Sequence, residues 1–180
     1  MIELGLEILN KIHENGYVAY IVGGYVRDSL LNISSNDIDI TTNATPKELK
    51  KIFPGVKMEL SNYGSLVLYY KNNRFDITTF RKEEKYLDNR HPSEIIYVND
   101  LKTDLLRRDF TINALCLDKD NKLIDLIGGV DDLNNHVLKT ITDSDISFQN
   151  DALRILRAIR FASLLDFNLS DEIIKAIKKN

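Results

Sequence analysis

The chain has 180 residues, of which 43% are hydrophobic and 28% charged, so it can form a folded core and is not a disordered tail. Its net charge of -3 excludes the overall basic character of a non-specific nucleic-acid binder. A single cysteine excludes an intrachain disulfide, and no apolar run approaches the length of about 20 residues that spans a membrane. The acidic N-terminal segment is unlike a signal peptide, so we expect a cytoplasmic protein without membrane contact.

Apolar periodicity predicts alternating helices and strands in the first part of the chain. The segment 81–99 differs, because it is highly charged, contains His91-Pro92 and has no clear period. We therefore predict a long functional loop there. The expected elements before it are helices over 4–12, 24–31 and 45–53 and strands over 17–22, 37–42, 56–60, 65–70 and 74–80.

Beyond the loop, the pattern changes from mixed to helical at about residue 140. Ser170 is expected to cap the last helix. Cys116 lies in an apolar run and should be a buried core thiol. The expected elements are a helix over 100–108, a short hairpin over 113–118 and 122–125, a turn at Gly128-Gly129, a strand over 136–141, and helices over 149–165 and 170–180.

A glycine pair, Gly23-Gly24, follows the predicted strand 17–22 and begins a predicted helix that contains Arg27. Glycines let a phosphate approach the backbone closely, and an arginine one turn into the helix can donate to phosphate oxygens. The same residues also suit an ordinary tight turn with Arg27 in solvent. The motif alone leaves both interpretations open.

Asp37 and Asp39 alternate along the predicted strand 37–42, so their side chains should share a face. Carboxylates are ligands that Mg²⁺ prefers, and two such ions can clamp the attacking and leaving oxygens of a phosphoryl displacement. Asp76 is the candidate third catalytic carboxylate, because a lone charge would be costly in its apolar strand. Turn capping is the alternative for Asp37, and we favour metal binding for the set.

Two further motifs carry charges at suggestive spacings. In the segment 107–113, Arg108 can meet phosphate, while Asp109 and Asn113 would share a helix face and could hold a sugar hydroxyl. Capping of a helical turn by Asp109 is the alternative.

The second motif places Asp151, Arg154, Arg157 and Arg160 at intervals of three, and only the first two are close neighbours on a helix. A carboxylate can accept from the amino group of cytosine or adenine while arginine donates to the ring nitrogen. Guanine and uracil present the opposite pattern and would leave buried groups unpaired. The alternative, a surface salt bridge, is favoured by this helix taken alone.

Taken in order, six motifs closely resemble those of the class II tRNA nucleotidyltransferases, which comprise CCA-adding enzymes and bacterial poly(A) polymerases. The resemblance implies an α+β fold with a polymerase-β-like nucleotidyltransferase head and a mixed five-stranded sheet over 1–140. The start of an all-helical neck, over 141–180, would follow. The family continues into helices that grip tRNA, so we expect this chain to be a truncated core. The motifs are GGYVRD, DID, RKEEKYLDNRHP, RRDFTINAL, IGGVDDL and DALRILRAIRFA.

The resemblance also implies roles for individual residues. Asp37 and Asp39 would hold Mg²⁺, and Asp109 with Asn113 would sense the ribose. Asp151 and Arg154 would select C and A, with Arg157 and Arg160 nearby, and the loop 81–99 would help the switch from C to A. The family usually has glutamate where this chain has Asn150, which we expect to orient Arg154. The triphosphate would meet Gly23, Gly24, Arg27 and Arg108.

The reaction we predict is attack of a tRNA 3′-hydroxyl on the α-phosphorus of CTP or ATP, with release of pyrophosphate. No protein partner is implied. CC-adding, A-adding and poly(A)-synthesising relatives remain alternatives. A nucleotide- or RNA-binding module without catalysis is an alternative of a different class.

Overall fold

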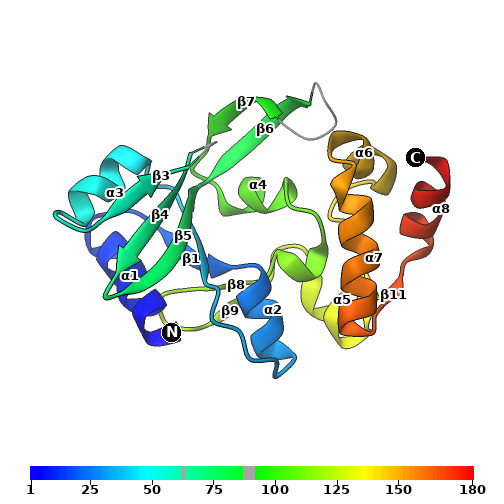
Figure 1. Cartoon of the computed structure of the whole chain (residues 1–180), viewed down its shortest axis with the longest axis horizontal. Coiled ribbons are helices and arrows are strands. Elements are labelled where there is room, and N and C mark those ends of the chain that lie inside the picture. Colours follow the sequence, from blue (N-terminus) through cyan, green and yellow to red (C-terminus); the bar gives the residue numbers. More distant parts are fainter. Residues whose placement is uncertain (62–63, 87–91) are drawn as a thin grey trace.

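The computed structural model describes residues 1–61, 64–86 and 92–180. Its centre is a mixed seven-stranded sheet in the order β3-β4-β5-β2-β1-β8-β9 (Figure 1). Strand β2 runs parallel to β5, and the other neighbours are antiparallel. The strands are β1 Ala19–Val22, β2 Asp39–Thr42, β3 Met58–Leu60, β4 Ser65–Tyr70, β5 Asn73–Thr79, β8 Cys116–Leu117 and β9 Leu123–Ile124.

The predicted α+β class is confirmed, and the expected count of five strands is wrong. The two-residue strands β8 and β9 extend the sheet past β1, where β8 pairs with Ile21 and Val22. The hairpin itself was expected from its alternating residues. Cys116 in β8 is fully buried, as predicted, and burial raises the pKa of its thiol to about 12.

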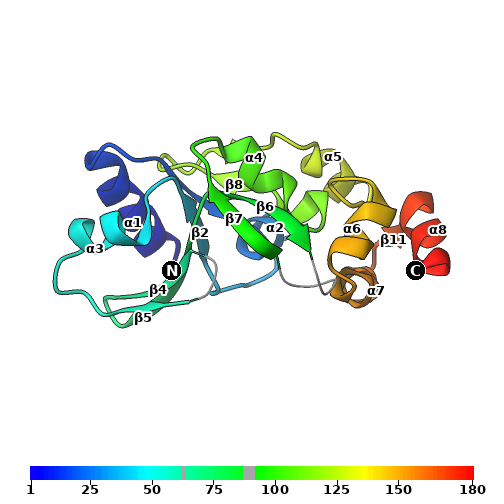
Figure 2. The same ribbon diagram turned by 90° about the horizontal axis from the view of Figure 1, so that it is seen from above.

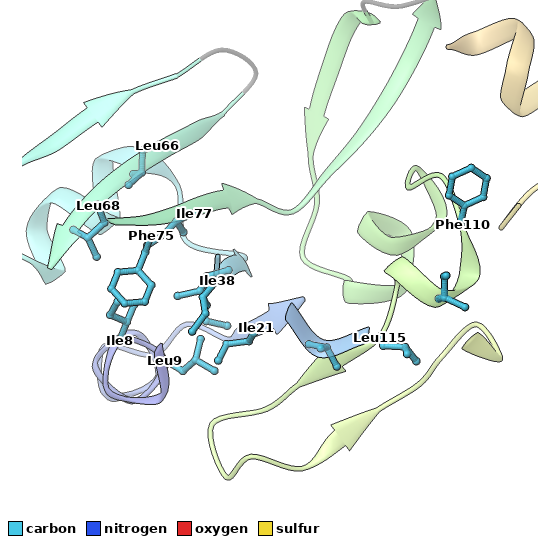
Figure 3. Close-up of a cluster of buried hydrophobic side chains, with 14 of the residues drawn as sticks. Ile8, Leu9, Ile21, Ile38, Leu66, Leu68, Phe75, Ile77, Phe110 and Leu115 are labelled. Carbon is cyan, nitrogen blue, oxygen red and sulfur yellow. The ribbon is translucent and has the colours of Figure 1, made fainter. Parts of the chain in front are cut away.

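One face of the sheet packs on helix α1 (Ile2–Glu14), with α3 (Pro46–Ile52) beside it. Ile8 and Leu9 of α1 lie against inward side chains of the strands, among them Ile21, Phe75 and Ile77 (Figure 3). Because strand side chains alternate, the residues between these apolar positions point to the opposite face. That opposite face carries Asp39, Thr41 and Asp76.

The opposite face is partly covered by helix α4 (Leu101–Leu106). Leu101 and Leu105 pack with Val22, Phe80 and Cys116 in a second apolar cluster. Helix α2 (Gly24–Leu30) follows β1 directly. The end of β1, from which α2 continues, lies beside the start of β2, where Val22 is paired with Asp39.

The chain ends in a helical region at the opposite end of the molecule from α1 and α3, as Figures 1 and 2 both show. The expected strand 136–141 shrinks to β10, which pairs in parallel with an unforeseen strand β11. The expected helix 149–165 is broken near Asp151, the C-cap of α6. The elements are α5 Gly129–Asn134, β10 Val137–Leu138, α6 Ser144–Asn150, α7 Leu153–Leu165, β11 Asn168–Leu169 and α8 Asp171–Lys179.

The segment 81–99, expected to be a long functional loop, contains two strands in the part that the structure describes. Strands β6 (Arg81–Tyr86) and β7 (Pro92–Tyr97) form an antiparallel hairpin that projects beyond the main sheet (Figure 1). Apolar alternation reports burial of one face, and the highly charged sequence of β6 lacks that signal. His91 lies outside the described residues. Among the described helices, none is long and apolar enough to cross a membrane.

Candidate active site

The strand register brings the predicted carboxylates of the sheet together. Asp39 is the direct neighbour of Asp76 across the parallel pair β2–β5 and of Val22 across the antiparallel pair β1–β2. Asp37 precedes β2 instead of lying within it, and it is exposed. Asp39, the first residue of β2, therefore lies beside Asp76 in the middle of β5, and Arg74 bonds to Asp76 at 2.9 Å.

The surroundings of Asp39 disfavour its charged form. Burial raises the pKa of Asp39 to about 6, Arg108 opposes the rise, and the charges of Asp37 and Asp76 add to it. A carboxylate whose pKa is raised by burial and by like charges is stabilised by a bound cation.

The residues fit a magnesium site that includes a substrate. In the described part of the chain, no three metal-ligating side chains already form a cluster. Mg²⁺ commonly uses one or two carboxylates and completes its shell with water and substrate phosphates. Asp39 and Asp37 supply hard oxygen donors of that kind, and Asp76 is adjacent.

Gly23 opens the space opposite Asp39. It follows β1 with φ of 85°, a conformation that suits glycine. A Cβ added there would lie 3.7 Å from Asp39 Oδ2 and 3.8 Å from Arg108 Nη1, between a carboxylate and a guanidinium. Gly24 begins α2, and a Cβ added to it would lie 3.6 Å from Arg27 Nη2. The glycine pair thus leaves room between the carboxylates and two arginines.

Arg108 is held by a buried carboxylate that sequence reasoning missed. Asp104 is fully buried in α4 and accepts from Arg107 Nε at 2.9 Å, Arg108 Nη2 at 3.5 Å and Thr41 Oγ1 at 3.0 Å. Burial acts to raise the pKa of Asp104, but the charges of Arg107 and Arg108, together with hydrogen bonds from the Arg81 backbone N–H and the Arg107 side chain, bring the pKa below its ordinary value. Arg108 Nε is buried without a hydrogen-bond partner among the described residues, so Arg108 keeps a donor unused.

Arg27, Asp109 and Asn113 form one buried chain of hydrogen bonds. Arg27 Nη1 donates to Asn113 Oδ1 at 2.7 Å, and Asn113 Nδ2 donates to Asp109 Oδ1 at 3.1 Å. Asp28 accepts from Arg27 Nε and Nη2. Asp109 precedes the short 3-10 helix η1 (Thr111–Asn113), so the two residues meet across a turn and not along one helix.

The glycine motif at 128–129 packs against the turn that joins Asp109 to η1. Gly129 packs so tightly that an added Cβ would lie 2.4 Å from the carbonyl oxygen of Thr111. Thr111 Oγ1 also donates to Asp132 at 2.7 Å. The carboxylate of Asp125 accepts from four backbone N–H groups, those of residues 127–130, and so fixes the start of α5. Helix α5 thereby positions η1.

The predicted base-reading pair is only partly assembled. Arg154 is buried in α7 and donates to Ser147 Oγ at 2.8 Å and to the carbonyl oxygen of Arg107 at 2.7 Å. Asp151 lies in the break between α6 and α7, where its Oδ1 accepts from the backbone N–H of Leu153. In the described part of the chain no hydrogen bond joins Asn150 to Arg154, so Ser147 takes the orienting role expected of Asn150.

Arg157 and Arg160 lie differently. Arg157 binds Asp109 through Nε at 2.7 Å and Nη2 at 2.6 Å, which ties α7 to the turn before η1. Arg160 is exposed. Phe161, which sequence reasoning also missed, lies under two guanidinium groups, with Arg27 at 4.9 Å and Arg157 at 5.2 Å from its ring centroid.

Of the three functional residues that were not predicted, two could have been recognised from their positions in the sequence and one could not. Asp104 lies between Leu101 and Leu105 on the inward face of a predicted helix, and a charge there indicates a buried partner. Phe161 follows Arg154 by seven positions and so shares its face. Ser147 has no such signal, because serine is common on any helix surface.

With this geometry established, comparison with known proteins assigns the family. Residues 19–139 match the family model described as the poly A polymerase head domain. The chain therefore belongs to that family of nucleotidyltransferase heads.

The relatives are named more narrowly. The chain is 46% identical over 171 residues to a CCA-adding enzyme of Staphylococcus haemolyticus, covering 95% of this chain and 43% of that protein. It is 43% identical to a CCA-adding enzyme of Lactobacillus helveticus, over 97% of this chain and 44% of that protein. The chain thus spans less than half the length of the curated relatives it matches.

Two solved structures are also similar. A Bacillus stearothermophilus CCA-adding enzyme in complex with CTP superposes with a TM-score of 0.89 at 35% identity, over 99% of this chain and 43% of that one. A tRNA nucleotidyltransferase complexed with a primer tRNA and an incoming ATP analog gives a TM-score of 0.77 at 34% identity, over 96% and 49%.

Proposed function

We propose that this protein acts in CCA addition, transferring CMP and AMP from CTP and ATP to the 3′ end of tRNA and releasing pyrophosphate. The observation that carries the proposal is the strand register that puts Asp39 beside Asp76, with Gly23 opening the space between Asp39 and Arg108. Relatives named as CCA-adding enzymes, and similar structures holding CTP or tRNA with an ATP analog, support the choice of substrates.

In this proposal Asp37 and Asp39 hold Mg²⁺, with Asp76 adjacent. When bound, Mg²⁺ would lower the pKa of the attacking hydroxyl and neutralise developing charge. Arg108, with its unused Nε donor, and Arg27 bind the triphosphate beside Gly23 and Gly24. Asp109 and Asn113, already joined by a hydrogen bond, orient the ribose.

Base selection is assigned to Asp151 and Arg154. A guanidinium has five N–H donors, so Arg154 retains donors for a base after bonding to Ser147 and to the Arg107 carbonyl. Asp151 uses Oδ1 on the backbone, which leaves Oδ2 to accept from the amino group of cytosine or adenine. Arg157 reaches the nucleotide site through Asp109, and exposed Arg160 is a candidate phosphate contact.

We also propose that residues 1–140 are the head and that 141–180 begin the neck, because the family match ends at residue 139. A cytoplasmic location belongs to the same proposal, since tRNA and nucleoside triphosphates are intracellular.

The test supplies tRNA that ends at the discriminator base with each nucleotide singly, then with CTP and ATP together, and sequences the 3′ ends. Ordered CCA ends are expected. Runs of A would indicate poly(A) synthesis instead, and CC alone or A alone would indicate the partial activities. Bound nucleotide without any product would contradict catalysis by this chain and leave a binding module.

A further inference from the structure

One face of α7 contacts the head at the proposed nucleotide site. The head residues that it contacts either belong to that site or are adjacent to it in the sequence. Arg154, Arg157 and Phe161 are separated by three and four positions, so they share that face. Arg154 bonds to the carbonyl of Arg107, which precedes Arg108, and Arg157 bonds to Asp109. The third contact is made by the ring of Phe161, and it involves no hydrogen bond.

The surroundings of Phe161 are unusual for a residue that only fills space. Two guanidinium groups lie over the ring, and one belongs to Arg27, the proposed triphosphate ligand in α2. Phe110, which links Asp109 to η1, meets the same ring edge to face at 5.9 Å and 84°. Cations prefer the electron-rich face of an aromatic ring, whereas an aliphatic side chain offers no such attraction. The ring therefore joins the head cation Arg27 to the helix cation Arg157.

We propose that Phe161 is a positioning residue that fixes the position of α7 relative to the triphosphate site. When Arg27 holds the triphosphate of a nucleotide, the base of that nucleotide then lies within reach of Arg154. This inference rests on the proposed function. Arg27 keeps its bonds to Asn113 and Asp28 without Phe161, so triphosphate affinity does not depend on the ring. The placement of α7 does depend on it.

The test uses Phe161→Leu, which keeps an apolar side chain and removes the aromatic face, and Phe161→Trp, which restores an aromatic face. Leu164→Ala is the matched control, because Leu164 lies on α7 and is 66% exposed. Circular dichroism and thermal melts establish that each variant is folded. Titrations then measure the affinity of each protein for tripolyphosphate, CTP and UTP in the presence of Mg²⁺.

In Phe161→Leu, tripolyphosphate affinity should change less than twofold, while the preference for CTP over UTP should fall about tenfold, as expected for the loss of the two contacts that join the ring to the head, the cation–π contact with Arg27 and the edge-to-face contact with Phe110. Phe161→Trp should restore the preference, and Leu164→Ala should leave it unchanged. An unchanged preference in Phe161→Leu, or an equal loss of affinity for all three ligands, would overturn the positioning role.

Hydrogen exchange separates this inference from the proposed function. Tripolyphosphate should slow amide exchange in α7 of the parent chain and not in Phe161→Leu. Slowed exchange without any preference for CTP would contradict base selection by α7 but support the coupling of α7 to the triphosphate site through Phe161. A preference for CTP without slowed exchange would contradict the coupling and keep base selection, and failure to bind tripolyphosphate would contradict both.

Discussion

The carboxylates on the sheet and the arginines on α7 differ in how well their surroundings stabilise their charges. On the sheet, Asp39 is partly buried beside Asp76 and near Asp37, and its pKa is raised to about 6. On α7, Arg154 and Arg157 are satisfied by Ser147, a backbone carbonyl and Asp109. Burial and nearby like charges therefore disfavour the charged form of Asp39, which a bound cation would stabilise, whereas α7 presents donors already fixed in place.

This contrast suggests a division of labour. A site that is electrostatically incomplete without metal suits the chemical step, and a preorganised set of donors suits recognition. The hydrogen-bonded chain Arg27–Asn113–Asp109–Arg157 joins α2, which follows β1, to α7. Substitutions of the sheet carboxylates should therefore change the rate of transfer, and substitutions on α7 should change the choice of base.

The largest effect is expected for Asp39→Asn. The amide preserves the size of the side chain but supplies no charge for Mg²⁺, so nucleotide transfer should fall about 10³-fold, equivalent to a loss of several kcal/mol of transition-state stabilisation. The measurement is single-turnover incorporation of CMP into tRNA. Thermal stability should not fall, since the substitution removes a carboxylate whose charged form is disfavoured by burial and by nearby like charges.

Glu59→Gln is the control, because Glu59 is a half-exposed carboxylate on β3 of the same sheet. Its activity should match that of the parent chain. Normal turnover by Asp39→Asn would refute the assignment of Asp39 to metal binding.

The next effect concerns the support beneath Arg108. Asp104→Ala leaves Arg107 and Arg108 buried without their shared carboxylate, which should reduce the free energy of unfolding by about 3 kcal/mol. Urea denaturation at pH 7 measures this loss. An effect below about 1 kcal/mol would show that Asp104 does not hold the two arginines.

The effect of Asp104 should also depend on pH. Its native pKa lies below the ordinary value, so the stability from its ionised form is complete above the unfolded-state pKa of about 3.9 and is lost as the pH falls through the native pKa. The stability difference between the parent chain and Asp104→Asn should therefore be constant from about pH 7 to 5 and shrink below about pH 4.

A smaller effect tests the link from α5 to η1. Gly129→Ala forces a Cβ against the carbonyl of Thr111 and should cost about 2 kcal/mol of stability while weakening CTP binding. Gly128→Ala is the matched comparison, because its φ is 89° but no atom lies within 4 Å of the added Cβ. It should cost about 1 kcal/mol through backbone strain alone and leave CTP binding intact. Equal effects on CTP binding would contradict a positioning role for α5.

The sequence predicted the parts of the fold that depend on local pattern. Apolar alternation located the main strands, and the capping residues Thr45 and Ser170 marked helix starts that the structure confirms. The hairpin β6–β7 was missed because β6 is highly charged and shows no apolar alternation. The break near Asp151 was missed because the residues on both sides favour helix, while packing of α6 against α8 sets its direction.

Some features of the candidate site could likewise be predicted from the sequence, and others could not. Asp39 and Asp76 could be predicted as partners, because a charge inside an apolar strand needs a reason. Their register could not, since the parallel pairing of β2 with β5 depends on the whole sheet. The contact of Arg157 with Asp109 joins residues 48 positions apart, and no local pattern encodes such a distance.

The most direct test of the division of labour is the base preference of Arg154→Lys. Lysine keeps the buried charge but lacks the planar fork that can serve Ser147, the Arg107 carbonyl and a base together. Competition between CTP and UTP in single-turnover transfer should show a preference reduced about tenfold, with the Mg²⁺ dependence of the rate unchanged. An unchanged preference for CTP, or a shifted Mg²⁺ dependence, would contradict the assignment of chemistry to the sheet and base choice to α7.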